Sequence, residues 1–222
     1  MAKIAIYTAI FGAHDELKPQ PACPGVDYVC FTDDASLASG RWQVEAAPPR
    51  HEHPRLAAKW FRTHPHVALA GYRHTIWIDG SFRLKSDSFA DDVLRHLGPS
   101  GFALLEHPRG TDLRREVNVS ERLPKYDGQP VRHQLEHYLH EGLPVNHGLW
   151  ATGLLVRDNE NERIRQLDEM WMEENVRWTY QDQISLAYLF WRLGIDPDVI
   201  PLTGGTLQDN DLFRIERHRT DR

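Results

Sequence analysis

The feature that most constrains this fold is a recurring pattern in which a short apolar run ends in small or acidic residues and a helical segment follows. Runs of strand length are predicted at 3–10, 27–32, 42–46, 75–78, 102–105, 150–156 and 199–202. Helices are predicted at 54–64, 89–97, 131–140, 160–176 and 182–193, the second one capped by Asp87 or Ser88. Strands alternating with helices indicate an α/β fold with a mostly parallel central sheet flanked by helices.

Length and composition narrow the class of protein further. The chain has 222 residues with no repeat or long linker, so we predict a single domain over 1–222, in which the polar stretch 110–148 forms an insertion or lid. No apolar run reaches the ~18 residues of a membrane span. The net charge of -6 disfavours duplex nucleic acid as a partner without excluding a local basic pocket for a small anion. Two cysteines are too few for a disulfide framework, which favours a reduced, cytoplasmic setting.

Polar side chains gather where the predicted strands end. These residues are Gly12 to Asp15, Asp33 and Asp34, Asp79 to Ser81, and Glu106 and His107. In open α/β sheets, ligands bind outside the carboxyl ends of the strands, so we expect these side chains to line one cleft. Because an acidic cleft repels itself, it implies a divalent metal or a cationic ligand.

The most informative strand end is Trp77-Ile78-Asp79-Gly80-Ser81. A carboxylate after a buried strand is a hard ligand suited to Mg²⁺ or Mn²⁺, and Gly80 lets a ligand approach the backbone closely. The alternative is that Asp79 only caps a turn.

Two helical segments carry further candidates. Arg55, Lys59 and Arg62 share one face of the predicted helix 54–64, which suits either a bound diphosphate or a solvated surface. Asp182 and Gln183 begin the helix 182–193, where they either face a polar substrate or cap the helix. The pairs His51/His53 and His64/His66 lack the spacing of a helical zinc site. The chain has no Gly-x-Ser-x-Gly, P-loop or Gly-x-Gly-x-x-Gly motif, which removes the commonest hydrolase, NTPase and dehydrogenase interpretations.

An ordered set of these stretches resembles a known family. The set is Tyr7 to Gly12, Asp15-x-Leu17-Lys18-Pro19, Asp27 to Asp34, Arg55-x-x-x-Lys59, Pro65-His66, Trp77 to Ser81, His107-Pro108-Arg109, Gly148 to Gly153, Val156-Arg157 and Asp182-Gln183. It resembles the TOD/MUCI-type glycosyltransferase-like family over about residues 3–200. The resemblance implies a GT-A fold that binds a nucleotide-sugar, usually with Mn²⁺ or Mg²⁺. The acceptor is left open as a glycan, a protein, a lipid or a modified nucleobase.

The resemblance also implies roles for single residues. Nucleoside-binding elements would be Thr8, Ala9, Phe11, Gly12 and Asp33, and Asp33 could accept the uracil N3–H, which favours UDP. Asp79 matches the first aspartate of the GT-A Asp-x-Asp metal motif, whose third position is Ser81 here, with His107 as a further ligand. Arg55, Lys59 and Gly80 would lie at the diphosphate.

Asp182 and Gln183 resemble the Asp-Gln pair of retaining transferases such as glycogenin, which favours retention of the anomeric configuration. In an inverting enzyme, Asp182 could instead act as the base. The segment 110–148 would lie on the acceptor side. The alternatives are a metal-dependent hydrolase or esterase on the same cleft, and a non-catalytic module that binds nucleotide or sugar.

Overall fold

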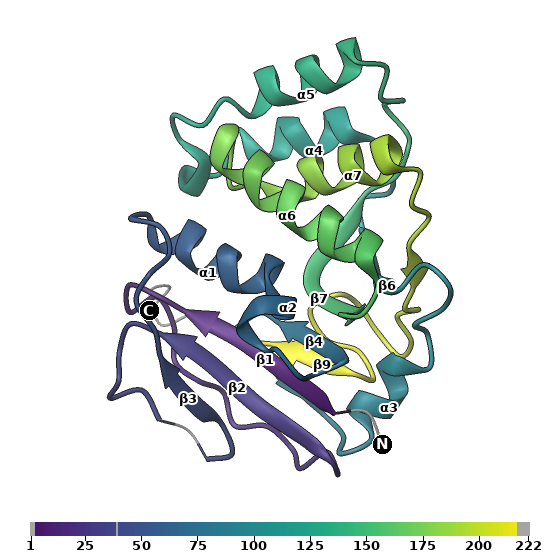
Figure 1. Ribbon diagram of the computed structural model, residues 1–222. Coiled ribbons are helices and arrows are strands. Elements are labelled where there is room, and N and C mark those ends of the chain that lie inside the picture. The colour runs from purple at the N-terminus through teal and green to yellow at the C-terminus, as the bar shows by residue number, and fades with distance from the viewer. Residues whose placement is uncertain (1–2, 39, 217–222) are drawn as a thin grey trace.

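A seven-stranded sheet forms the centre of the computed structural model, which describes residues 3–38 and 40–216 (Figure 1). The strand order is β3-β2-β1-β4-β7-β6-β8. The strands are β1 (Ile4–Ile10), β2 (Val26–Thr32), β3 (Gln43–Ala46), β4 (His74–Ile78), β6 (Phe102–Glu106), β7 (Trp150–Asp158) and β8 (Asp198–Val199). Strand β7 is antiparallel to β4 and β6, whereas the other pairings of this sheet are parallel. This confirms the predicted α/β class, and the architecture is consistent with a GT-A-like fold.

Each face of the sheet has its own hydrophobic core, because successive strand side chains point to opposite faces. Tyr7 belongs to one cluster and its neighbour Ile6 to the other. The Tyr7 face is covered by α1 (Pro54–Thr63), α2 (Pro65–Ala68), α4 (Leu113–Ser120), α5 (Val131–His140), α6 (Glu162–Arg177) and α7 (Asp182–Leu193) (Figure 1). The Ile6 face is covered by α3 (Phe89–Leu94) and by a small antiparallel sheet of β5 (Phe82–Leu84) and β9 (Phe213–Ile215).

Several predicted elements differ from the observed ones. Helix α3 is shorter than predicted, and the side chain of its N-cap residue Ser88 makes no capping bond, because it donates to Asp92 Oδ2 at 2.7 Å. Helix α4 was not predicted, since its buried Leu113 and Val117 stand one turn apart among charged residues. The short strands β5 and β9 were also missed. The last predicted strand is reduced to the two residues of β8.

The topology brings one end of several strands together. Because β7 runs against its neighbours, its first residues lie at the same edge as the last residues of β1, β4 and β6. Glu106 at the end of β6 pairs with Trp150 at the start of β7, so the chain leaves this edge at 106 and returns beside it at 150. The excursion between them contains α4, a 3₁₀ turn at Pro124–Tyr126 and α5.

The structure also bears on the predictions about membrane-spanning helices and disulfides. None of the helices in residues 3–38 and 40–216 has the length and apolar character needed to cross a bilayer. Cys23 and Cys30 are both buried and are not joined in a disulfide.

Candidate functional site

A cavity of about 620 Å³ opens at this edge of the sheet, a size typical of small-molecule sites. Its walls come from the end of β1, the residues after β4, the start of β7, one face of α1, the beginning of α7 and the 3₁₀ turn. The charged side chains in this lining are Asp15, Arg55, Lys59, Arg62, Asp79, Lys125 and Asp182. The strand-end cleft expected from the sequence exists in part, and basic residues share it with acidic ones. Of the residues predicted to line it, Gly12, His14, Asp15, Asp79 and Gly80 do so, whereas Asp33, Asp34, Ser81, Glu106 and His107 lie outside the lining.

Helix α1 turns its basic face into this cavity. The helix starts at Pro54, and the ring of His53 accepts a hydrogen bond from the backbone N–H of Arg55 at 3.2 Å, which caps the helix. Arg55, Lys59 and Arg62 all line the cavity, and Arg62 is only 4% exposed. The stripe at i, i+4 and i+7 is thus a pocket wall and not a solvated surface.

Asp182 lies between the basic face of α1 and the start of β7. Its carboxylate forms ion pairs with Lys59 and Arg62 and accepts a hydrogen bond from the Thr152 hydroxyl at 3.1 Å. The capping alternative is wrong, because the N-cap of α7 is Gln181, whose side-chain oxygen accepts from the N–H of Gln183 at 2.9 Å. The carboxylate of Asp182 therefore does not cap the helix.

The two cations beside Asp182 are strongly desolvated. Burial lowers the pKa of Lys59 well below its usual value, and the neighbouring charge of Arg62 lowers it further. Burial also lowers the pKa of Arg62 to about 10. The guanidinium of Arg62 lies 4.8 Å from the ring centroid of Trp171, which adds a cation–π contact. Both side chains contact the Asp182 carboxylate, and ion pairing of this kind favours their charged forms against the effect of burial.

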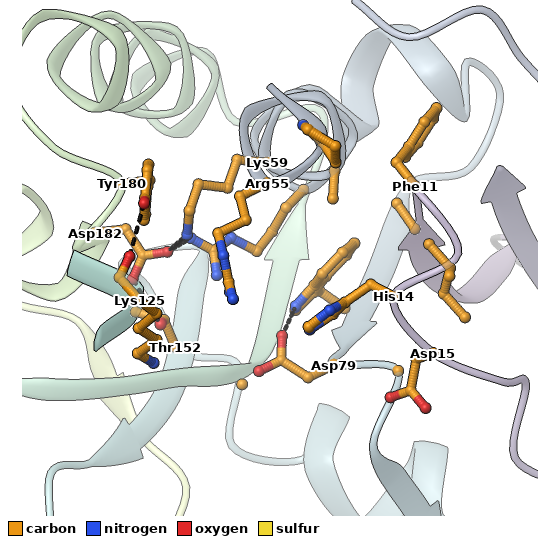
Figure 2. Close-up of a pocket in the computed structure, with 18 of the residues that line it drawn as sticks. Phe11, His14, Asp15, Arg55, Lys59, Asp79, Lys125, Thr152, Tyr180 and Asp182 are labelled. Carbon is orange, nitrogen blue, oxygen red and sulfur yellow. Dashed lines mark hydrogen bonds and ion pairs between the residues drawn. The ribbon is translucent and has the colours of Figure 1, made fainter. Parts of the chain in front are cut away.

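Asp79 is half-buried and faces the cavity from the end of β4 (Figure 2). Its N–H donates to the carbonyl of Gly153 at 2.9 Å, and its Oδ1 accepts from the indole of Trp77 at 2.9 Å. A Cβ at Gly153 would lie 2.7 Å from the ring of Phe82 and 3.1 Å from Asp79 Oδ2, so glycine is required for this approach. Gly80 also lines the cavity, but a Cβ there would make ordinary contacts.

The three predicted metal ligands are not brought together. Ser81 is buried and outside the lining of the cavity. His107 is buried too, with its Nε2 3.8 Å from Glu116, and it also lies outside the lining. In the described ranges, no group of three or more His, Cys, Asp or Glu side chains is arranged to hold a metal ion. The residues present therefore do not fit the ligand set implied by the Asp-x-Asp motif.

Only some of the predicted nucleoside-binding residues line the cavity. Ala9, Phe11 and Gly12 line the cavity, whereas Thr8 is buried outside it. Asp33 lies outside the lining as well, and both of its carboxylate oxygens accept from the N–H of Gly12, at 3.1 and 3.0 Å. Asp33 thus fixes the turn after β1.

Gln183 and its neighbours connect α4 to the cavity. Gln183 lines the cavity, and its Oε1 accepts from Gln181 Nε2 at 3.0 Å. The same Gln181 Nε2 donates to the buried Glu116 of α4 at 3.0 Å. In this arrangement the Nε2 of Gln183 has no acceptor among the residues that the structure describes, so it is available to a ligand.

Sequence reasoning missed Tyr180 and gave Lys125 no role beyond membership of the acceptor-side or lid segment. Tyr180 stacks on His53 with 4.8 Å between ring centroids, and its hydroxyl donates to the carbonyl of Lys125 at 2.6 Å. Figure 2 shows Lys125 and Tyr180 on the Asp182 side of the pocket, with His14, Asp15 and Asp79 on the other. Lys125 belongs to the stretch predicted as a lid, which was the available signal for it. Tyr180 stands in a turn without any recognisable motif.

Comparison with known proteins identifies the family. The profile described as "TOD1/MUCI70, glycosyltransferase-like domain" matches residues 32–202. The chain belongs to this glycosyltransferase-like family. It is also similar to a protein of Arabidopsis thaliana named "Probable hexosyltransferase MUCI70", with 25% identity over 218 residues, covering 83% of this chain. The match spans 36% of that relative, so the chain corresponds to about a third of the plant protein.

Proposed function

We propose that this protein transfers a sugar, a hexosyl group by analogy with its relative, from a nucleotide-sugar donor to an acceptor. The observation that carries the proposal is the cavity at the carboxyl ends of β1 and β4, where the cations of α1 lie beside Asp79 and Asp182. A nucleotide-sugar has an anionic diphosphate next to a neutral, hydroxyl-rich sugar. A pocket with both basic and hydrogen-bonding side chains complements both parts. A UDP-sugar is the favoured donor, on the resemblance stated for the sequence.

The transfer breaks the bond between the anomeric carbon and the phosphate oxygen. Negative charge then grows on the departing diphosphate while the sugar gains oxocarbenium character. The cationic side chains of α1 would stabilise the departing diphosphate. Asp182 and Gln183 would lie near the anomeric carbon, where the free amide N–H of Gln183 can donate to a sugar hydroxyl. Asp182 would act mainly by its charge and by holding Lys59 and Arg62 in place.

The surroundings of Asp182 support a retaining reaction. An inverting transferase needs a carboxylate base to take the proton of the acceptor hydroxyl. Both oxygens of Asp182 already accept hydrogen bonds or ion pairs, which makes this carboxylate a poor base. NMR of the product linkage tests this point, and an inverted anomeric configuration would contradict it.

The segment 110–148 is proposed as the acceptor-side element, and the domain is proposed to extend over 1–222. Lys125 and Tyr126 of this segment line the cavity, and Glu116 supports Gln183 through Gln181. The nature of the acceptor and the cytoplasmic setting stay predictions. Assistance by Mn²⁺ or Mg²⁺ was predicted from the resemblance, but no step is assigned to a metal, because the predicted ligands do not assemble.

A stabilisation and turnover screen tests the proposal. The protein is melted with UDP, GDP and their sugars, and release of free nucleotide is followed by chromatography with candidate acceptors. A transferase is stabilised by one nucleoside diphosphate and releases it from the donor. A hydrolase or esterase would ignore all of these nucleotides. A binding module would be stabilised by a nucleotide and would never release it from the donor.

A further inference from the structure

The cations of the cavity outnumber the carboxylates available to them. Arg62 and Lys59 share the single carboxylate of Asp182. Within residues 3–38 and 40–216, no carboxylate lies within ion-pair distance of Arg55 or of Lys125. This leaves Arg55 and Lys125 as cations that line the cavity without an ionic partner of their own.

The fold holds these like charges close together. Arg55 is fixed on the first turn of α1, with its guanidinium 5.9 Å from the ring centroid of Tyr180. The hydroxyl of the same Tyr180 binds the carbonyl of Lys125. Tyr180 therefore brings Arg55 and Lys125 to one side of the cavity, as Figure 2 shows.

Like charges in the cavity lower the pKa values of its two lysines. Partial burial lowers the pKa of Lys125, and the charge of Arg55 is the next cause. The charges of Lys125 and Arg55 also lower the pKa of Lys59, although the opposing effect of Asp79 is larger than either of them. Cations placed together in a cavity are unfavourable in the empty site and become favourable when an anion of two or more charges binds. The arrangement points to a polyanionic ligand.

We propose that Arg55, Lys125 and Lys59 bind the diphosphate of the donor directly and that these side chains replace a divalent cation at this site. The inference rests on the proposed function and specifies how its donor is held. Two independent observations carry it. The cavity contains unpaired cations on the Asp182 side, and the predicted ligands Asp79, Ser81 and His107 do not assemble on the other. Arg and Lys side chains bind phosphate oxygens well through charge-assisted hydrogen bonds.

Calorimetric titration of the full chain with UDP and with GDP tests the inference. Each nucleotide is titrated once with EDTA present and once with Mn²⁺. We expect the preferred nucleotide to bind in EDTA with a Kd close to that measured with Mn²⁺. Arg55→Gln and Lys125→Gln should each weaken binding in EDTA by about tenfold or more, the expected loss for one charge-assisted contact. Arg122→Gln, which removes an exposed cation outside the cavity, is the matched control and should bind like the unchanged protein.

Asp79→Asn separates the two modes of binding by the direction of its effect. If a metal on Asp79 holds the diphosphate, the substitution abolishes the binding that Mn²⁺ promotes. If the side-chain cations hold it, the substitution removes a negative charge from the cavity, and binding in EDTA is unchanged or tighter. Circular dichroism and thermal melting of each variant show that it is folded.

The possible results are distinguishable. Binding in EDTA that is lost in Arg55→Gln and kept in Asp79→Asn supports the inference. Binding that requires Mn²⁺ and is lost in Asp79→Asn overturns it while leaving the proposed transferase intact. If neither nucleotide binds with or without metal, the inference and the proposed nucleotide-sugar donor both fail.

Discussion

At the scale of single residues, the carboxylate of Asp182 has the largest structural consequence. It is the partner of the buried Arg62 and the partly buried Lys59, and it anchors α7 to α1 and β7. An isolated buried charge is expensive, so a buried ion pair is felt most when one partner is removed. Asp182 therefore holds the site together whatever its part in the reaction.

We expect Asp182→Asn to destabilise the fold by about 3–5 kcal/mol, because it leaves the buried Arg62 and the partly buried Lys59 without their carboxylate. The free energy of unfolding in urea measures the effect. Asp209→Asn is the matched control, since Asp209 pairs with Lys85 where both side chains are exposed, and a loss below about 1 kcal/mol is expected there. Equal losses in the two variants would show that the Asp182 ion pairs do not stabilise the protein.

Single residues also show how far the sequence could be interpreted. Asp79, Arg55 and Lys59 were placed in the cavity correctly, because strand ends and helical spacing determine where such side chains point. His107 and Asp33 follow strands as well, yet neither lines the cavity. His107 lies beside Glu116, and Asp33 accepts hydrogen bonds from the N–H of Gly12. The positions of these two side chains depend on partners that are distant in sequence, and the spacing of residues does not predict such partners.

At the scale of elements, the junction between the end of β1 and the start of α1 shapes one wall of the cavity. Gly12 has a φ of +67°, and a Cβ at this position would lie 2.9 Å from the ring of Pro54. The left-handed conformation and the close approach of Pro54 both require glycine there.

We expect Gly12→Ala to cost more stability than Gly25→Ala. Gly25 has a similar φ of +71°, but a Cβ there would meet no other atom. Gly25→Ala therefore has only the conformational cost of about 1–2 kcal/mol. The excess measured for Gly12→Ala by thermal melting reports the contact with Pro54. The reasoning is refuted if the two variants melt alike.

The Tyr180 hydroxyl ties the turn that carries Lys125 to the residues before α7, in addition to the turn's own backbone hydrogen bonds. We expect Tyr180→Phe to lower stability by about 0.5–1.5 kcal/mol and to expose residues 121–129 to protease sooner. Limited proteolysis with mass spectrometry measures this. Tyr72→Phe removes a comparable bond, to Asp27, far along the sequence from this turn, and should leave the cleavage of 121–129 unchanged. Equal cleavage of 121–129 in Tyr180→Phe and the unchanged protein would argue against this restraint.

Prediction of elements succeeded where the apolar pattern was long. The strands β1 and β2 and the helices α6 and α7 were predicted to within a few residues. The two strands are nearly unbroken apolar runs, and in each of the two helices more than ten positions contribute to the periodic pattern. Strands of three residues, such as β5 and β9, carry too little pattern. The reversed direction of β7 is a tertiary property that its own residues do not encode.

At the scale of the whole molecule, partly or fully buried histidines make the stability depend on pH. Burial lowers the pKa of His64, His66 and His107 from the usual 6.5 in the folded protein. As the pH falls, the unfolded chain binds protons first, so the native state is fully stabilised above 6.5 and loses stability below it.

We therefore expect the contribution of these histidines to the free energy of unfolding to be smaller at about pH 5.5 than at about pH 7.5, whereas Asp168, whose pKa burial raises to about 7, contributes in the opposite direction. His66→Gln should reduce that difference, since burial lowers the pKa of His66 although its Nε2 lies 3.7 Å from the carboxylate of Glu169. His133→Gln is the control, because His133 is exposed on α5. Equal differences in all three proteins would exclude this source of acid sensitivity.

The pairing of Glu106 with Trp150 gives the excursion between them two adjacent anchor points in the sheet. Because the two ends of this insert lie next to each other in the sheet, the insert can be exchanged without altering the order of the strands. Residues 107–149 are consequently a natural unit for grafting between relatives. A transplanted version would have to supply its own apolar contacts to α7, where Leu113 and Leu135 now pack in the same cluster. It would also have to keep Lys125 at the cavity and an acceptor in the place of Glu116 for Gln181.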